Sequence, residues 1–123
     1  MLHTRVIIFL ILSVLFAATH ALAMNLSLYY IFGWFDIVMH FWGGGLIALG
    51  VNSASTFSRL HFKPTIWIFI GVFICIATAW EVFEWFAGLY DPVTYVTDTV
   101  KDVIVGLGGG LLAHWQLRRY TIS

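Results

Sequence analysis

The sequence predicts an all-α integral membrane protein, a single membrane domain over residues 1–123 that forms a four-helix bundle with both termini in the cytoplasm. Three observations lead to this prediction. The composition is 61% hydrophobic and 10% charged, so the chain lacks the polar surface that a soluble domain of this length requires. Four apolar runs approach the length of about 20 residues that a helix needs to cross a bilayer. Lys and Arg gather in segments that would lie on one side of the membrane.

The four predicted spans cover about residues 6–23, 28–51, 66–89 and 98–117. The first is an almost unbroken apolar run. The second is interrupted only by Asp36, His40 and glycines, and the third carries two glutamates near its end. Because backbone polar groups in lipid must form hydrogen bonds within their own segment, we expect each run to be helical.

The first run has a second interpretation. Arg5, an apolar core and Ala21-Leu22-Ala23 resemble a secretory signal peptide with its cleavage site. The run is long for the apolar part of a signal peptide, which favours a retained span. Cleavage would leave three spans with the same polar residues.

The basic residues predict the orientation. With an even number of crossings, five of the six fall on a single side: Arg5, Arg59, Lys63, Arg118 and Arg119. The positive-inside rule makes that side cytoplasmic. Lys101 is the exception. Aromatic residues near the other side, Tyr29 among them, are expected to form a belt at the outer interface.

Six ionisable side chains lie in these apolar segments at helical spacing: Asp36 and His40, Glu81 and Glu84, and Asp98 and Asp102. A charged side chain at the bilayer centre costs about 2.5–3.5 kcal/mol on insertion scales, so we expect a short chain that keeps three such pairs to use them. Spacings of three and four residues place the members of each pair on one helix face. Because successive spans alternate in direction, all three pairs fall in the outer half of the bundle.

The polar helix faces continue as small residues, which let membrane helices approach closely. In the second span these are Gly43 and Gly50, and in the fourth they include Gly106 and Gly109. Gly106-x-x-x-Gly110 is a known form of such a contact. We therefore expect the carboxylates to face one another across a tight bundle.

Five converging carboxylates, with Lys101 as the one Lys or Arg on their side, require protonation or a bound cation. A divalent metal ion would neutralise them. Carboxylate oxygen and imidazole nitrogen suit zinc, iron or manganese, whereas magnesium would prefer the oxygens alone. The candidate ligands are Asp36, His40, Glu81, Glu84, Asp98 and Asp102.

Two of the pairs also have a structural interpretation. Asp36 could cap a shorter second span, and Thr99-x-x-Asp102 matches a capping box at the start of the fourth. Helix capping does not explain Glu81 and Glu84. They approach the C-terminal end of their helix, where negative charge is disfavoured, and no basic residue lies one turn away.

Other histidines are weaker candidates. His20 could approach the site from the first span. His114 lies ~18 Å along the fourth helix from Asp102 at a rise of 1.5 Å per residue, which is too far to join it.

Three sequence blocks resemble the signature blocks of the YjdF-type bacterial inner-membrane proteins: FDIVMHFWGGG, AWEVFEWFAGLY and VTDTVKDVIVGLGGGLLA. Those proteins carry an aspartate with His-Phe-x-x-Gly, a Glu-x-x-Glu-Trp block and an Asp-Thr-x-x-Asp block with trailing glycines. They are in turn distantly similar to the VanZ-like membrane proteins linked to glycopeptide resistance. The resemblance covers Phe35 to about Ala113. It implies a multi-pass protein of the bacterial cytoplasmic (inner) membrane, selects the same six residues, and implies no established activity.

The leading functional hypothesis is a divalent metal site in the outer half of the bundle. It would support hydrolysis or group transfer on a membrane lipid or envelope precursor, with Glu84 as general base. One alternative is a proton- or cation-coupled transporter that uses the acids as relay groups. Another is a non-catalytic membrane subunit whose polar pairs bind a second copy or a partner's helix. The net charge of zero argues against a nucleic-acid partner.

Overall fold

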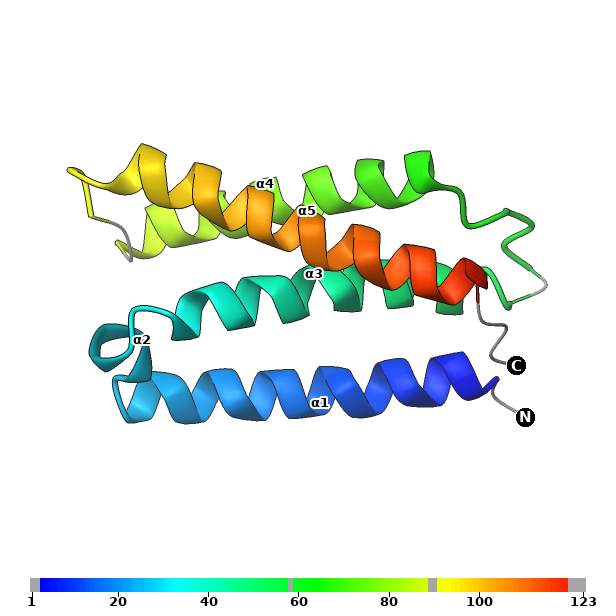
Figure 1. Ribbon diagram of the computed structural model, residues 1–123, viewed down its shortest axis with the longest axis horizontal. Coiled ribbons are helices and arrows are strands. Elements are labelled where there is room, and N and C mark those ends of the chain that lie inside the picture. Colours follow the sequence, from blue (N-terminus) through cyan, green and yellow to red (C-terminus); the bar gives the residue numbers. More distant parts are fainter. Residues whose placement is uncertain (1–2, 58, 89–90, 120–123) are drawn as a thin grey trace.

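The computed structural model describes residues 3–57, 59–88 and 91–119, and within these ranges the chain forms helices and no β-strand. In chain order the helices are α1 (Thr4–Asn25), α2 (Leu28–Ile31), α3 (Phe35–Ala54), α4 (Ile66–Ala87) and α5 (Tyr95–Arg119). Successive long helices run in opposite directions, so α1 begins and α5 ends at the same end of the molecule (Figure 1). The all-α prediction is confirmed.

Three helices are long and apolar enough to cross a membrane: α1, α3 and α4. Helix α5 has 25 residues, but it is not among the candidate spans found in the described parts of the chain. Its glycines, together with Lys101, Asp102 and His114, lower its hydropathy. Composition thus supports three of the four predicted spans.

The outer surfaces of α1 and α4 are strongly apolar. The exposed fraction is 68% for Val14, 77% for Trp67 and 83% for Phe86. Continuous apolar surface of this kind would cause association in water. A lipid environment accounts for it, which agrees with a membrane location.

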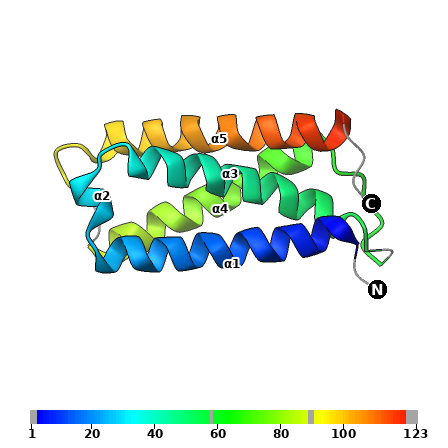
Figure 2. The ribbon, with the colours of Figure 1, turned by 60° about the horizontal axis from the view of Figure 1, so that its bottom comes forward.

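Helix α3 is the central element of the fold. It lies between α1 and α5 in both views (Figure 1, Figure 2), and it also contacts α4. Its contact with α5 is the most extensive between any two helices described. Glycine makes this contact possible: a Cβ added at Gly44 would collide with the carbonyl oxygen of Gly106, and one at Gly109 with that of Phe41. The two backbones therefore approach each other directly.

The glycines predicted to continue the polar helix face are confirmed on α5, but on α3 the prediction chose the wrong glycine. Gly106 and Gly109 of α5 both lie against α3. On α3, however, Gly43 faces the Phe16 ring of α1, and its neighbour Gly44 makes the contact with α5. A step of one residue turns a helix by about 100°, so α3 presents successive glycines to two different neighbours.

A small apolar core lies beside the glycine contact. Ala48, Phe69 and Phe73 are buried and form one cluster. The Phe73 ring would lie 3.1 Å from a Cβ added at Gly106, and the Phe69 ring would collide with one at Gly110. Two phenylalanines of α4 thus fill the space that the glycines of α5 leave open, which fixes α4 against the α3–α5 pair.

The segment predicted as one span over residues 28–51 forms two helices. Residues 28–31 are the separate turn α2, which follows Ser27 in the left-handed conformation (φ 56°), and α3 begins only at Phe35. The Tyr29 and Phe35 rings pack edge to face with centroids 5.2 Å apart. The chain reverses direction here, and this reversal carries Tyr29 back toward α1.

Local signals set the ends of α4. Thr65 is its N-cap, and the Thr65 hydroxyl oxygen accepts a 3.3 Å hydrogen bond from the backbone N–H of Ile68. Gly88 ends the helix with a φ of 71°, a left-handed conformation that glycine adopts without strain. The C-terminal end of α4, whose last two turns carry Glu81 and Glu84, is therefore well defined by sequence.

We expect Gly44→Ala to destabilise the protein, because overpacking a tight interface costs about 1–3 kcal/mol. Gly108→Ala is the matched control: nothing lies within 4 Å of its added Cβ, and alanine is the better helix former. The measurement is the midpoint of thermal unfolding in detergent, followed by the monodisperse fraction on size exclusion. Equal midpoints for the two variants would contradict the direct backbone contact.

Candidate functional site

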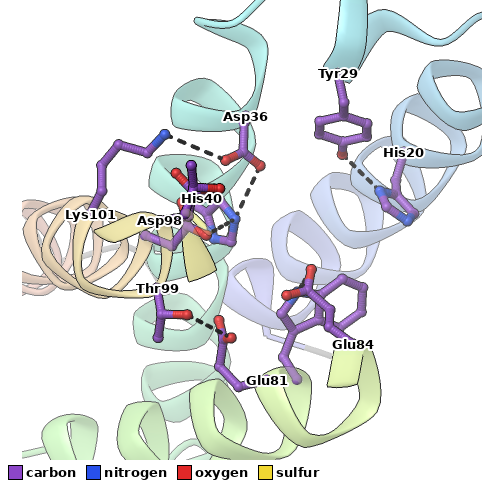
Figure 3. A network of polar contacts seen from close by, with 12 residues as sticks. His20, Tyr29, Asp36, His40, Glu81, Glu84, Asp98, Thr99 and Lys101 are labelled. Atoms are coloured by element: carbon purple, nitrogen blue, oxygen red, sulfur yellow. Dashed lines mark hydrogen bonds and ion pairs between the residues drawn. The ribbon is translucent and has the colours of Figure 1, made fainter. Parts of the chain in front are cut away.

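Three predicted site residues from two helices meet between α3 and α5. Asp36 lies in the first turn of α3, His40 follows one turn later (Figure 3), and Asp102 comes from α5. His40 Nε2 is 3.2 Å from Asp36 Oδ1 and 3.2 Å from Asp102 Oδ2. One ligand atom from each of the three residues lies within 4.8 Å of the others.

The glycine contact positions this cluster. Gly106 lies one turn after Asp102 on α5, and a Cβ added there would be 3.5 Å from the carbonyl oxygen of His40. The α3 and α5 backbones are therefore closest immediately beside the polar residues. This proximity brings the short Asp102 side chain within reach of the imidazole on the other helix.

The charges in the cluster are incompletely balanced. Two carboxylates face one imidazole, and Lys101 Nζ reaches Asp36 Oδ2 only at 4.0 Å. Imidazole Nε2 carries at most one hydrogen, so it cannot donate a full hydrogen bond to both aspartates at once. Asp102 Oδ1 is buried and has no hydrogen-bond partner among the described residues. The arrangement suits an additional positive charge at its centre.

The other three predicted ligands lie nearby but outside this cluster. Each accepts a hydrogen bond from a different side chain: Glu81 from Thr99 (3.1 Å), Glu84 from Trp80 (2.9 Å) and Asp98 from Thr94 (3.0 Å). Glu81 and Glu84 are half-buried and face the space between α3 and α4 (Figure 3), whereas Asp98 is exposed. The predicted set of six ligands therefore narrows to Asp36, His40 and Asp102.

Both capping interpretations are wrong. The N-cap of α3 is Trp34, so Asp36 lies inside the first turn. Helix α5 begins at Tyr95, which places both Thr99 and Asp102 inside the helix. The Thr99 hydroxyl is thereby free to bond to α4 across the bundle.

A second polar contact, between α1 and α2, was not anticipated from the sequence. His20 Nδ1 and the Tyr29 hydroxyl are 2.7 Å apart. Burial, together with the negative charges of Asp36 and Glu84, raises the pKa of Tyr29 to about 12, so its hydroxyl stays neutral. His20 thus lies beside the site, bonded to Tyr29 and packed edge to face against Trp80 with ring centroids 6.0 Å apart. The sequence predicted Tyr29 as an interfacial anchor, and the α2 turn that redirects it carries no hydropathy signal.

We expect Thr99→Val to lower stability by about 0.6 kcal/mol, the mean for hydrogen bonds between membrane helices, because it removes the donor that links α5 to Glu81. Thr94→Val is the matched control, since the Thr94 hydroxyl, just before α5, bonds to Asp98 in the first turn of that helix and, among the described residues, to no other helix. Unfolding in mixed micelles measures both. A Thr94→Val effect as large as that of Thr99→Val would contradict a special role for the interhelical bond.

Comparison with known proteins identifies the family. Residues 4–122 match the family model described as "Predicted membrane protein (DUF2238)". This match is consistent with the resemblance to the YjdF-type proteins, and the likeness to the VanZ-like proteins stays a prediction. No match was found among the curated proteins or the solved structures. Because the matched segment spans nearly the whole sequence, the chain belongs to the DUF2238 family of predicted membrane proteins.

Proposed function

We propose that this membrane protein binds a divalent metal ion between α3 and α5, with Asp36, His40 and Asp102 as ligands. The observation that carries the proposal is the position of His40 Nε2, 3.2 Å from a carboxylate oxygen of each aspartate. Ligand atoms around a tetrahedral zinc ion, each bonded at about 2.0–2.1 Å, lie about 3.3 Å apart. The His40–Asp36 and His40–Asp102 distances thus match the spacing that an ion would impose, and one ligand atom of each of the three residues lies within 4.8 Å of the others.

The donor set favours zinc, iron or manganese. One imidazole nitrogen and two carboxylates suit these metals, whereas magnesium selects oxygen ligands. Three protein ligands also leave a coordination position open, as in catalytic rather than structural zinc sites. The side chains of Asp36 and His40 are 33% and 24% exposed, so a small molecule or a lipid headgroup can reach them.

An open metal position supports hydrolysis or group transfer on a membrane lipid or envelope precursor. The metal would lower the pKa of a bound water, and a nearby carboxylate would take its proton. Glu84 is our candidate for this general base, because its carboxylate lies within electrostatic range of His40 and Asp36. Trp80 holds Glu84 through a 2.9 Å hydrogen bond and would orient it.

We further propose that α5 is a fourth span, in a multi-pass protein of the bacterial inner membrane. Helix α5 packs along α3, and it turns Ile104 (64% exposed), Leu112 (45%) and Trp115 (52%) outward. Basic residues gather where α1 begins and α5 ends, which supports a cytoplasmic location for that end.

A non-catalytic role is the second candidate. A protonated His40 together with Lys101 would balance the charges of Asp36 and Asp102, and the cluster would then hold α3 and α5 together without a metal. A transporter is less favoured. The core of Ala48, Phe69 and Phe73 separates the polar cluster from the opposite end, with no polar relay group among those side chains.

We expect purified wild-type protein to bind one zinc ion per chain, and Asp102→Asn and His40→Gln to weaken that binding by about tenfold or more. Asp98→Asn, one turn earlier on α5, is the matched control and should bind normally. The measurement is metal content by mass spectrometry after equilibrium dialysis, with circular dichroism to verify folding.

Absence of bound zinc, iron and manganese from folded wild-type protein would refute the metal site. Loss of thermal stability in the same two variants, with no metal in wild type, would instead favour the ion-pair network.

Cysteine labelling tests the proposed orientation. In a Cys75→Ser background, Thr4→Cys and Phe57→Cys should be protected from an impermeant maleimide in spheroplasts, and Asp91→Cys should react. Lysed cells should show labelling at all three positions, which serves as the control. Labelling of Thr4→Cys together with Asp91→Cys in intact spheroplasts would place both residues outside, which would contradict the proposed three spans between them, α1, α3 and α4.

A further inference from the structure

The end of the molecule opposite the metal cluster contains a pocket lined by basic residues from three separate elements. Arg5 comes from α1, Lys63 from the α3–α4 connection and Arg118 from the last turn of α5. The buried Asn52 and the N-cap Thr65 also line it. The pocket has a volume of about 360 Å³.

No described Asp or Glu side chain lines this pocket. The acidic residues lie in the early turns of α3 and α5, in the last turns of α4 or in the α4–α5 connection, all at the other end of the helices. Three converging cations raise the local positive potential, which attracts an anion. Guanidinium groups match phosphate particularly well, because they donate two parallel hydrogen bonds.

A second, more open groove of about 550 Å³ shares Arg118 with the basic pocket. Ile66, Leu111 and Trp115 give it a largely apolar lining. His114 also lines this groove and is only 4% exposed, and within the described structure neither of its ring nitrogens has a hydrogen-bond partner. A buried polar group without a partner costs free energy, so a ligand with a polar atom here would be favoured.

We propose that these two cavities together bind one anionic phospholipid. The lipid phosphate occupies the basic pocket between Arg5, Lys63 and Arg118, and an acyl chain follows the apolar groove. An ester or hydroxyl oxygen of the same lipid bonds to His114. The shared Arg118 and the apolar lining favour a lipid over free phosphate, because free phosphate would leave the groove unfilled. This site is independent of the metal cluster.

The test uses the purified full-length protein in detergent with three probes: dioctanoyl phosphatidylglycerol, dioctanoyl phosphatidylcholine and inorganic phosphate. Binding is measured by native mass spectrometry and by the shift in thermal unfolding. We expect saturable binding of the phosphatidylglycerol, and at most weak binding of the other two probes.

Lys63→Gln should weaken phosphatidylglycerol binding about fivefold, as expected for one basic residue near an anionic lipid. Arg118→Gln should weaken it further, since Arg118 lines both cavities. Arg59→Gln is the matched control: it removes a positive charge from the same connection, but Arg59 lines neither cavity. Lys63 is exposed, so its replacement keeps the test valid if Arg118→Gln fails to fold.

Equal binding of phosphatidylglycerol and phosphatidylcholine would overturn the proposal. Inorganic phosphate that binds as tightly as the lipid, or displaces it at equal concentration, would show a free-anion site and would also overturn it. Equal loss of phosphatidylglycerol binding in Lys63→Gln and Arg59→Gln would overturn the proposal as well.

Discussion

The direct contact between the α3 and α5 backbones is the constraint on which the rest of the structure depends. Gly44 and Gly106 remove the side chains that would otherwise hold these helices apart. The close approach brings Asp102 to His40, and it leaves a groove on α5 that Phe73 fills from α4. The same glycines therefore determine the helix arrangement and the polar site. A bundle with ordinary interaxial distances of 8–10 Å would separate the two aspartates.

Helical content and the spacing of the polar pairs were predictable, because both follow from local periodicity. The rotation of α3 about its own axis, which decides the neighbour that each of its faces contacts, was not predictable. Residues 43–45 are all glycine, so composition cannot tell which of them faces α5. The packing of Phe16 against Gly43 makes that choice, and it depends on α1. The break between α2 and α3, at residues 32–34, was equally hidden, since apolar residues lie on both sides of it.

The energetic cost of charge in an apolar segment selected six residues, and it takes their contacts in the structure to separate Asp36, His40 and Asp102 from the other three. Trp80 donates a hydrogen bond to Glu84 four residues later on the same helix, a spacing that can be read from the sequence. Thr99 donates a hydrogen bond to Glu81 from another helix, and no spacing along the sequence predicts that contact. Asp36 and Asp102 share His40 as their common partner, and Asp102 keeps one buried oxygen without a hydrogen bond in the described structure. The incomplete hydrogen bonding of these carboxylates, rather than their acidity alone, is what distinguishes the cluster where we propose a cation.

The two ends of the molecule must each be neutralised locally. A helix of about 20 residues is about 30 Å long, and at an effective dielectric constant of 20 two unit charges at that distance interact by only about 0.6 kcal/mol. The same charges at 4 Å interact by about 4 kcal/mol. The aspartates beside His40 therefore gain almost nothing from Arg5 or Arg118. The proposed cation at one end and the proposed anion at the other would therefore act independently, so the loss of either ligand should leave the other site intact.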